Sequence, residues 1–145
     1  MADKTLLKWK SLMISDAFVE KLVDAAEIET FVNNATIETK KAIIIFGANW
    51  CPDCRILAGL IQSAQNHKSI RENFRFLLID VKNYEINMNV LKQLDPKADS
   101  GIPRVFIFDN NNILLNLDRN DYFRTVRSMH ENALIDYLDS FRMAT

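Results

Sequence analysis

A short apolar run, AIIIF at residues 42–46, contains no polar residue. Its β-branched side chains favour a strand, and the lack of alternation indicates that both faces of this strand are covered. A second, mainly apolar run, FRFLLID at residues 74–80, predicts another central strand. A sheet that is covered on both faces needs helices on each side, so we expect an α/β fold with a central mixed β-sheet.

Helical patterns and one hairpin account for most of the remaining chain. Apolar residues recur at helical spacing in the segments 18–35 (one helix or two), 51–66, 90–94 and 134–141. Ser128 and Glu131 in SMHE have the spacing of a capping box, which would open the last of these helices. The runs RVFIF and ILLNL, separated by DNNN as the turn, predict a hairpin over residues 104–117.

Size and charge exclude several classes of protein. The 145 residues, of which 48% are hydrophobic, are enough for one ordinary core, so we expect no second large domain. The net charge of -1 predicts no binding to nucleic acid or to an anionic membrane. The apolar runs are far shorter than the roughly 20 residues that cross a bilayer, and the first residues lack the apolar core of a signal peptide. We therefore expect a cytoplasmic protein, or a periplasmic one if a signal peptide has been removed.

Cys51 and Cys54 are the only cysteines in the chain. A disulfide between them would close a loop of about four residues, which restricts the unfolded chain too little to serve as a structural staple. A metal site would need two further ligands, and His67 and His130 are the only histidines, so we expect no metal. The pair is therefore predicted to be a redox dithiol.

The cysteine pair lies where the first strand passes into a helix. Free backbone N–H groups and the positive end of the dipole at a helix N-terminus favour a thiolate, so we expect a lowered pKa for Cys51. Pro52 suits the first helical turn. Cys54 lies one turn further in and is expected to be more buried. We therefore expect Cys51 to attack a substrate disulfide and Cys54 to resolve the mixed disulfide.

The motif WCPDC at residues 50–54, followed by GIPR with Pro103, resembles the thioredoxin superfamily. The resemblance implies a thioredoxin-like fold in which Pro103 follows a cis peptide bond and faces the dithiol. It also implies that the backbone of Ile102 pairs with the substrate chain. Trp50 adjoins Cys51 in the sequence, so we expect it to form a wall of the site. These three residues are the predicted substrate-binding residues.

The resemblance covers the element order of roughly residues 27–142 and leaves the start of the chain outside it. We expect residues 1–26 to form a helical extension that packs on a thioredoxin-like domain of residues 27–145. Thioredoxins carry an acidic residue where this chain has Ile45, and a proline where it has Gly59. The glycine pair with which glutaredoxins hold glutathione is absent, so glutaredoxin activity is not expected.

Two charged residues next to the dithiol are predicted to tune its pKa. At about 7 Å and an effective dielectric constant of about 20, Arg104 would favour the thiolate by up to roughly 2 kcal/mol, and Asp53 would disfavour it by a similar amount. We expect partial cancellation and a pKa of about 7 for Cys51. Arg119, Arg124 and Arg127 could form an anion-binding edge, but we expect their segment, residues 119–127, to be a solvated loop.

Three functions are compatible with these residues. The first is a thiol–disulfide oxidoreductase of thioredoxin type, which reduces disulfides in protein or peptide substrates and is restored by an upstream thiol reductant. The second is a periplasmic disulfide oxidase or isomerase, which would draw on an upstream oxidant. The third is a partner-binding module that uses the groove formed by Trp50, Ile102 and Pro103. None of the three requires a cofactor beyond the dithiol.

Overall fold

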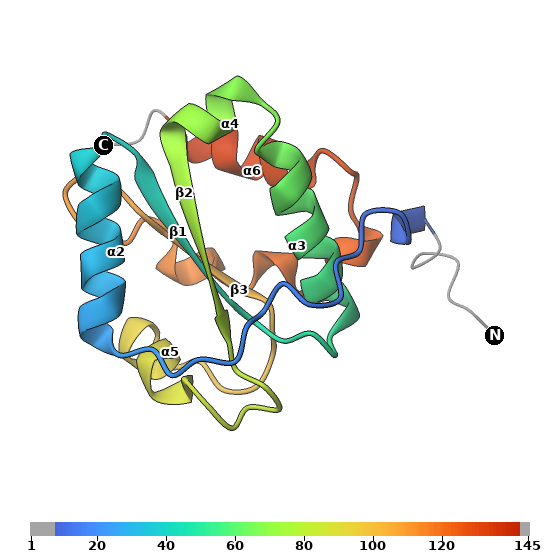
Figure 1. The fold of residues 1–145 in the computed structure, drawn as a ribbon, viewed down its shortest axis with the longest axis horizontal. Coiled ribbons are helices and arrows are strands. Elements are labelled where there is room, and N and C mark those ends of the chain that lie inside the picture. Colours follow the sequence, from blue (N-terminus) through green and yellow to red (C-terminus); the bar gives the residue numbers. More distant parts are fainter. Residues whose placement is uncertain (1–7, 143–145) are drawn as a thin grey trace.

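The computed structural model describes residues 8–142 and has a three-stranded sheet at its centre (Figure 1). The strands are β1 (Lys41–Gly47), β2 (Phe74–Asp80) and β3 (Arg104–Phe108), in the order β2-β1-β3. β1 runs parallel to β2 and antiparallel to β3. The prediction of a central strand at residues 74–80 is wrong, because β2 lies at an edge of the described sheet and its middle residues are only partly buried. Every residue of β1 is buried, as predicted for a strand covered on both faces. Residues 1–7 of the predicted extension, and residues 143–145, lie outside the described residues.

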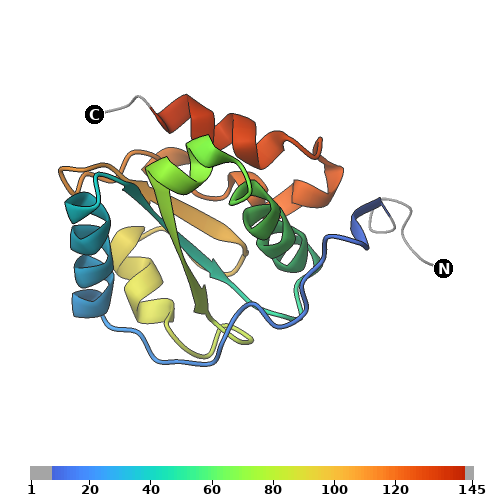
Figure 2. The ribbon, with the colours of Figure 1, turned by 45° about the horizontal axis from the view of Figure 1, so that its top comes forward.

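Helices cover both faces of this sheet. The helices α2 and α5 lie on one side of it, and α3, α4 and α6 lie on the other (Figure 1, Figure 2). Their bounds are α2 Ala25–Ile37, α3 Pro52–Ala64, α4 Lys68–Asn73, α5 Met88–Leu94 and α6 Ala133–Arg142. The predicted α/β class with a mixed sheet is confirmed. Within residues 8–142, no helix has the length and apolar character needed to cross a membrane.

The predicted hairpin after β3 is wrong in its second half. Within the described chain, residues 113–117 form no strand and make only an isolated bridge to Phe108. The side chain of Asn116 accepts a hydrogen bond from Ile107 N at 2.9 Å and donates one to Val105 O at 2.7 Å. The Asn116 side-chain amide thus forms hydrogen bonds with backbone groups of β3 that a second strand would otherwise have paired. The chain then continues through two 3₁₀ helices, η1 (Leu117–Arg119) and η2 (Tyr122–Ser128).

The last helix begins later than the sequence predicted. Ser128 is the final residue of η2, and α6 starts only at Ala133, so Ser128 and Glu131 do not form a capping box. The turn before α6 is instead stabilised by His130, whose Nδ1 accepts a hydrogen bond from Asn132 N at 3.1 Å.

The segment before α2 is extended, although its apolar spacing predicted a helix. Residues 19–24 contain no helical turn, and the side chains of Val19 and Leu22 are exposed by 71% and 73%. Backbone N–H and C=O groups next to and within this segment form hydrogen bonds with side chains of the rest of the domain. Asn49 Oδ1 accepts from Phe18 N at 3.0 Å, and Asn49 Nδ2 donates to Phe18 O at 2.8 Å.

The same segment docks on α3 at Gly59. A Cβ atom at this position would lie 1.6 Å from the carbonyl oxygen of Leu12. Close by, Ile14 N donates a hydrogen bond to Arg55 O on α3 at 3.1 Å. Only a glycine allows two backbones to approach so closely. The contact explains why a glycine stands where thioredoxins have a proline.

Replacing Gly59 with alanine should therefore destabilise the protein. Helix propensity alone would favour alanine by about 1 kcal/mol. The clash with Leu12 should outweigh this gain and lower the free energy of unfolding by roughly 1 to 3 kcal/mol, as measured by urea denaturation. Gln62→Ala, at an exposed position of the same helix, is the control and should change stability by less than about 0.5 kcal/mol. A Gly59→Ala protein more stable than the wild type would contradict this packing.

Candidate active site

Cys51 forms the N-cap of α3, directly after the loop that leaves β1. Its backbone is extended, and its Sγ accepts a hydrogen bond from Cys54 N at 3.4 Å. Pro52 occupies the first helical turn, as predicted. Both cysteines are free thiols, and Cys54 is the deeper of the two, with 0% exposure against 6% for Cys51. The predicted placement of both thiols in the fold is confirmed.

The two thiols have pKa values that are shifted in opposite directions. A hydrogen bond from the Cys54 side chain is the main cause that lowers the pKa of Cys51 to about 7, and the backbone N–H groups of Cys54 and Asp53 add to it. Burial and the charge of Asp53 act against this lowering. Burial raises the pKa of Cys54, and its interactions with Cys51 raise it further. Near neutral pH, Cys51 is therefore the thiol that supplies a thiolate.

The loop before β3 lies across from the N-terminus of α3. The Ile102–Pro103 peptide bond is cis, as the resemblance implied. The Cys51 thiol donates a hydrogen bond to Ile102 O, with 3.8 Å between Sγ and the oxygen. The fold thus brings Cys51, Ile102 and Pro103 together from two separate parts of the chain.

Asp53 is buried, and Arg127 holds its carboxylate. Oδ1 accepts a hydrogen bond from Arg127 N at 3.0 Å, and Oδ2 lies 3.8 Å from Arg127 Nε. Burial raises the pKa of Asp53, and the contacts with Arg127 oppose that rise. Arg127 belongs to η2, which packs against α3, so the prediction of a loop over residues 119–127 is wrong, although Arg119 and Arg124 are exposed as expected. The sequence carried no sign of this pair, because 74 positions separate the two residues.

The N-terminal segment contributes two aromatic residues to the surroundings of the dithiol. Trp9 is buried, and its Nε1 donates a hydrogen bond to Arg127 O at 2.9 Å. Phe18 packs over Gly47, where a Cβ atom would lie 2.5 Å from the Phe18 ring and 3.0 Å from Cys54 Sγ. The surroundings of Cys54 are therefore partly built by a segment outside the thioredoxin resemblance.

Arg104 does not act on the dithiol as the sequence suggested. Its Nε donates to Gly101 O at 2.8 Å, and its Nη1 donates to Asn120 Oδ1 at 3.0 Å. Nη1 also lies 3.9 Å from the carboxylate of Asp95. The lowered pKa of Cys51 comes mainly from Cys54. Asp53 raises this pKa, as expected, but the lowering comes from Cys54 and not from Arg104.

Trp50 lies at the surface beside the dithiol and is 52% exposed. Its Nε1 donates a hydrogen bond to Lys82 O at 2.7 Å. Its ring packs edge-on against Tyr84, with 6.0 Å between the ring centroids. These contacts fix the orientation of the indole and leave part of it exposed to solvent.

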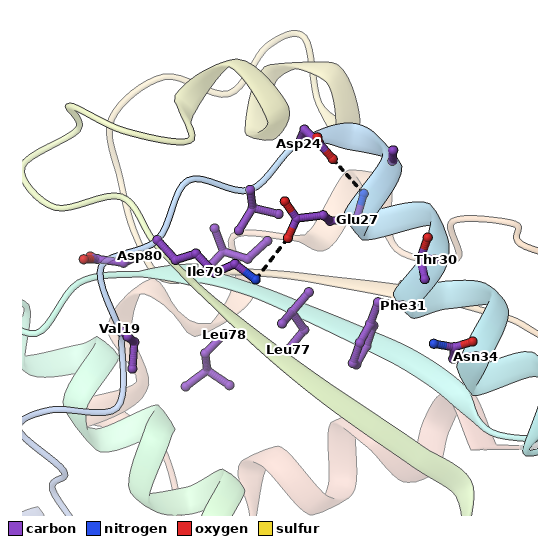
Figure 3. Close-up of a pocket in the computed structure, with 13 residues that line it drawn as sticks. Val19, Asp24, Glu27, Thr30, Phe31, Asn34, Leu77, Leu78, Ile79 and Asp80 are labelled. Atoms are coloured by element: carbon purple, nitrogen blue, oxygen red, sulfur yellow. Dashed lines mark hydrogen bonds and ion pairs between the residues drawn. The ribbon is translucent and has the colours of Figure 1, made fainter.

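A pocket of about 510 Å³ lies between α2, β2 and the N-terminal segment (Figure 3). Phe31 and Leu77 belong to its apolar wall, and Glu27 at its rim pairs with Lys21 at 3.1 Å. Its lining includes neither cysteine, so this pocket is separate from the dithiol. Among residues 8–142, no three His, Cys, Asp or Glu side chains gather as a metal site would require.

A sheet with helices on both faces, a dithiol at a helix N-terminus and a facing cis-proline define a thioredoxin-fold protein. Residues 25–110 match a family model described as thioredoxin-like. That match spans more than half of the chain, and the protein therefore belongs to the thioredoxin-like family.

The chain is similar in fold to two solved structures. One is a disulphide isomerase from Xylella fastidiosa Temecula1, with a TM-score of 0.67 and 20% identity, covering 85% of this chain and 95% of that one. The other is an HIV epitope-scaffold, with a TM-score of 0.52 and 19% identity, covering 97% of this chain and 84% of that one. At these identities the likeness concerns the fold.

One curated protein is similar in sequence over a limited stretch. Autophagy-related protein 2 of Debaryomyces hansenii is 28% identical over 83 residues, which are 55% of this chain. The stretch amounts to 4% of the length of that protein.

Replacing Cys54 with alanine should raise the pKa of Cys51, because the Cys54 side chain is the main cause of its lowering. In the wild-type protein, the rate of Cys51 alkylation by iodoacetamide should be half-maximal at a pH of about 7. In Cys54→Ala this midpoint should move toward the ordinary cysteine value of about 8.5. An unchanged midpoint would exclude Cys54 as the controlling group.

Replacing Asp53 with asparagine should lower the pKa of Cys51. The variant removes a charge that disfavours the thiolate, while its amide oxygen still accepts the hydrogen bond from Arg127 N. The same alkylation profile measures the shift. Asp136→Asn, on the exposed side of α6, should leave the profile unchanged. If both variants behave like the wild type, Asp53 does not tune the dithiol.

Proposed function

We propose that this protein is a thiol–disulfide oxidoreductase that reduces disulfides in protein or peptide substrates. The observation that carries the proposal is the position of Cys51, a thiol with a lowered pKa at the N-terminus of α3, opposite the cis Ile102–Pro103 bond. A thiolate held in this way is a nucleophile at neutral pH. A second thiol one turn away completes a dithiol that can be oxidised reversibly.

The reaction takes two exchange steps. The Cys51 thiolate attacks one sulfur of the substrate disulfide, the substrate S–S bond breaks, and one substrate thiolate leaves. Cys54, as a thiolate, then attacks Cys51 Sγ and releases the second substrate thiolate. The substrate gains two electrons, and the protein is left with a Cys51–Cys54 disulfide. An upstream thiol reductant returns the protein to the dithiol form.

The second step requires Cys54 to lose its proton. The pKa of this thiol is raised by burial and by its contact with Cys51. When Cys51 is bound in the mixed disulfide it carries no thiolate charge, so the part of the rise that comes from that charge disappears. Ile45 stands at the acidic position of thioredoxins and cannot accept a proton. In our proposal Asp53 or a water molecule accepts it.

The substrate chain would lie along the surface formed by Trp50, Ile102 and Pro103. Trp50 offers an exposed indole, and the backbone of Ile102 offers groups that an extended chain can pair with. We place the protein in the cytoplasm, where a reducing dithiol is kept reduced by cellular thiols. No nucleic acid, membrane or further cofactor enters this proposal.

A disulfide oxidase or isomerase is the second candidate function. The observation that favours it is the likeness in fold to a disulphide isomerase over 85% of this chain. The same dithiol would serve that reaction if its reduced form were more stable than its disulfide form. That role would fit a periplasmic location with an upstream oxidant.

The reduction potential of the dithiol separates the two candidates. We expect a value near about -270 mV in a defined thiol–disulfide buffer, whereas a value between about -180 and -120 mV would favour an isomerase or oxidase. The wild-type protein should also catalyse insulin reduction by dithiothreitol. Cys51→Ser should lower that rate by at least about a hundredfold, because the nucleophile is lost. If no disulfide forms at any potential, the proposal is wrong.

A further inference from the structure

The loop that follows β2 contains an unusual concentration of left-handed backbone. Lys82, Tyr84 and Asn87 have φ angles of 50°, 63° and 59°, and none of them is a glycine. Residues with side chains adopt this conformation where the surrounding structure holds them in it, and such positions gather at functional sites. The backbone conformation of this loop therefore indicates a functional role for it.

Two polar side chains hold this loop in place. Asp80 Oδ1 accepts a hydrogen bond from Lys82 N at 2.8 Å. Asn87 is buried, and its Nδ2 donates to Asp80 O and to Lys21 O, each at 2.8 Å. Its Oδ1 accepts from Val23 N at 2.8 Å. The loop is thus fastened both to the end of β2 and to the N-terminal segment.

What the loop presents to the redox site is the side chain of Tyr84. The Tyr84 ring packs edge-on against Trp50, and Lys82 O accepts the hydrogen bond from the same indole. The Tyr84 hydroxyl accepts a hydrogen bond from Gly101 N at 3.1 Å. One side chain therefore links Trp50, before the cysteines, to the loop that carries the cis-proline.

The Gly101 peptide is held from several directions. The Gly101 N–H donates a hydrogen bond to the Tyr84 hydroxyl, and the Gly101 carbonyl oxygen accepts one from Arg104 Nε at 2.8 Å. Gly101 has a φ of 114°, and a Cβ atom there would lie 2.5 Å from the Arg124 guanidinium. The next residue is Ile102, whose carbonyl faces Cys51. The position of Gly101 therefore sets where the backbone of Ile102 lies relative to the attacking thiol.

We propose that Tyr84 is a positioning residue for the disulfide substrate, an inference that rests on the proposed function. By holding the Gly101 amide and the Trp50 ring together, it fixes the distance between the two walls of the substrate groove. An extended peptide that pairs with the backbone of Ile102 depends on this spacing. A small disulfide that meets only the Cys51 sulfur does not depend on it. Tyr84 therefore selects for peptide substrates without taking part in the chemistry.

The test compares Tyr84→Phe with the wild-type protein on two oxidants. The variant keeps the ring against Trp50 and removes the acceptor of the Gly101 N–H. We expect the second-order rate constant for insulin reduction by the reduced protein to fall roughly two- to tenfold, the range that corresponds to one hydrogen bond. The rate with 5,5′-dithiobis(2-nitrobenzoate) and the pH midpoint of Cys51 alkylation should not change.

Tyr122→Phe is the matched control, because it removes a tyrosine hydroxyl from η2 and keeps the ring, which stacks on Tyr137. It should react with both oxidants like the wild type. Hydrogen exchange of the Gly101 amide, measured by NMR, reports the contact itself and should become faster in Tyr84→Phe alone.

Three results would overturn the inference. They are an unchanged insulin rate in Tyr84→Phe, an equal fall with both oxidants, and an unchanged exchange rate of the Gly101 amide. A failure of the proposed function gives a different result. A wild-type protein that reduces the small oxidant but not insulin would show that disulfides in proteins or peptides are not its substrates. That result would overturn both proposals, whereas the first three leave the oxidoreductase standing.

Discussion

The central strand β1 is the element on which the rest of the structure depends. It pairs with β2 on one side and β3 on the other, and all its residues are buried. Burial of both faces requires a helical layer on each, which α2 and α5 supply on one side and α3, α4 and α6 on the other (Figure 2). The strand also determines where Cys51 lies, because the short loop after Gly47 leads directly to the N-cap of α3.

Side-chain amides, more than regular hydrogen-bonded elements, hold the irregular parts of this fold. Asn49 and Asn87 bond to the extended N-terminal segment, and Asn116 bonds to β3 where a hairpin partner was expected. Each amide both donates and accepts, so one side chain can replace a pair of backbone hydrogen bonds. This arrangement lets segments without helix or strand lie close to the core while their backbone groups remain paired.

The electrostatics of the dithiol come from contacts across the fold and not from neighbours in the sequence alone. Cys51 is favoured as a thiolate mainly by Cys54, while Asp53 opposes it and is itself held by Arg127 from η2. Trp9 in turn bonds to Arg127. Hydrogen bonds therefore connect the N-terminal segment, η2 and α3 around the two thiols. Arg104, which lies next to the cis-proline in sequence, instead donates a hydrogen bond to the carbonyl oxygen of Gly101.

Local patterns in the sequence were enough for the strands β1 and β2, the active-site helix and the placement of its two cysteines. The run AIIIF and the motif WCPDC act through short-range rules, which are burial of apolar residues and the properties of a helix N-terminus. The extended course of residues 19–24, the role of Asn116 and the contact of Asp53 with Arg127 could not be predicted in this way. Each depends on a partner that is distant in sequence, and only the packing of the whole chain decides which partner a polar group meets.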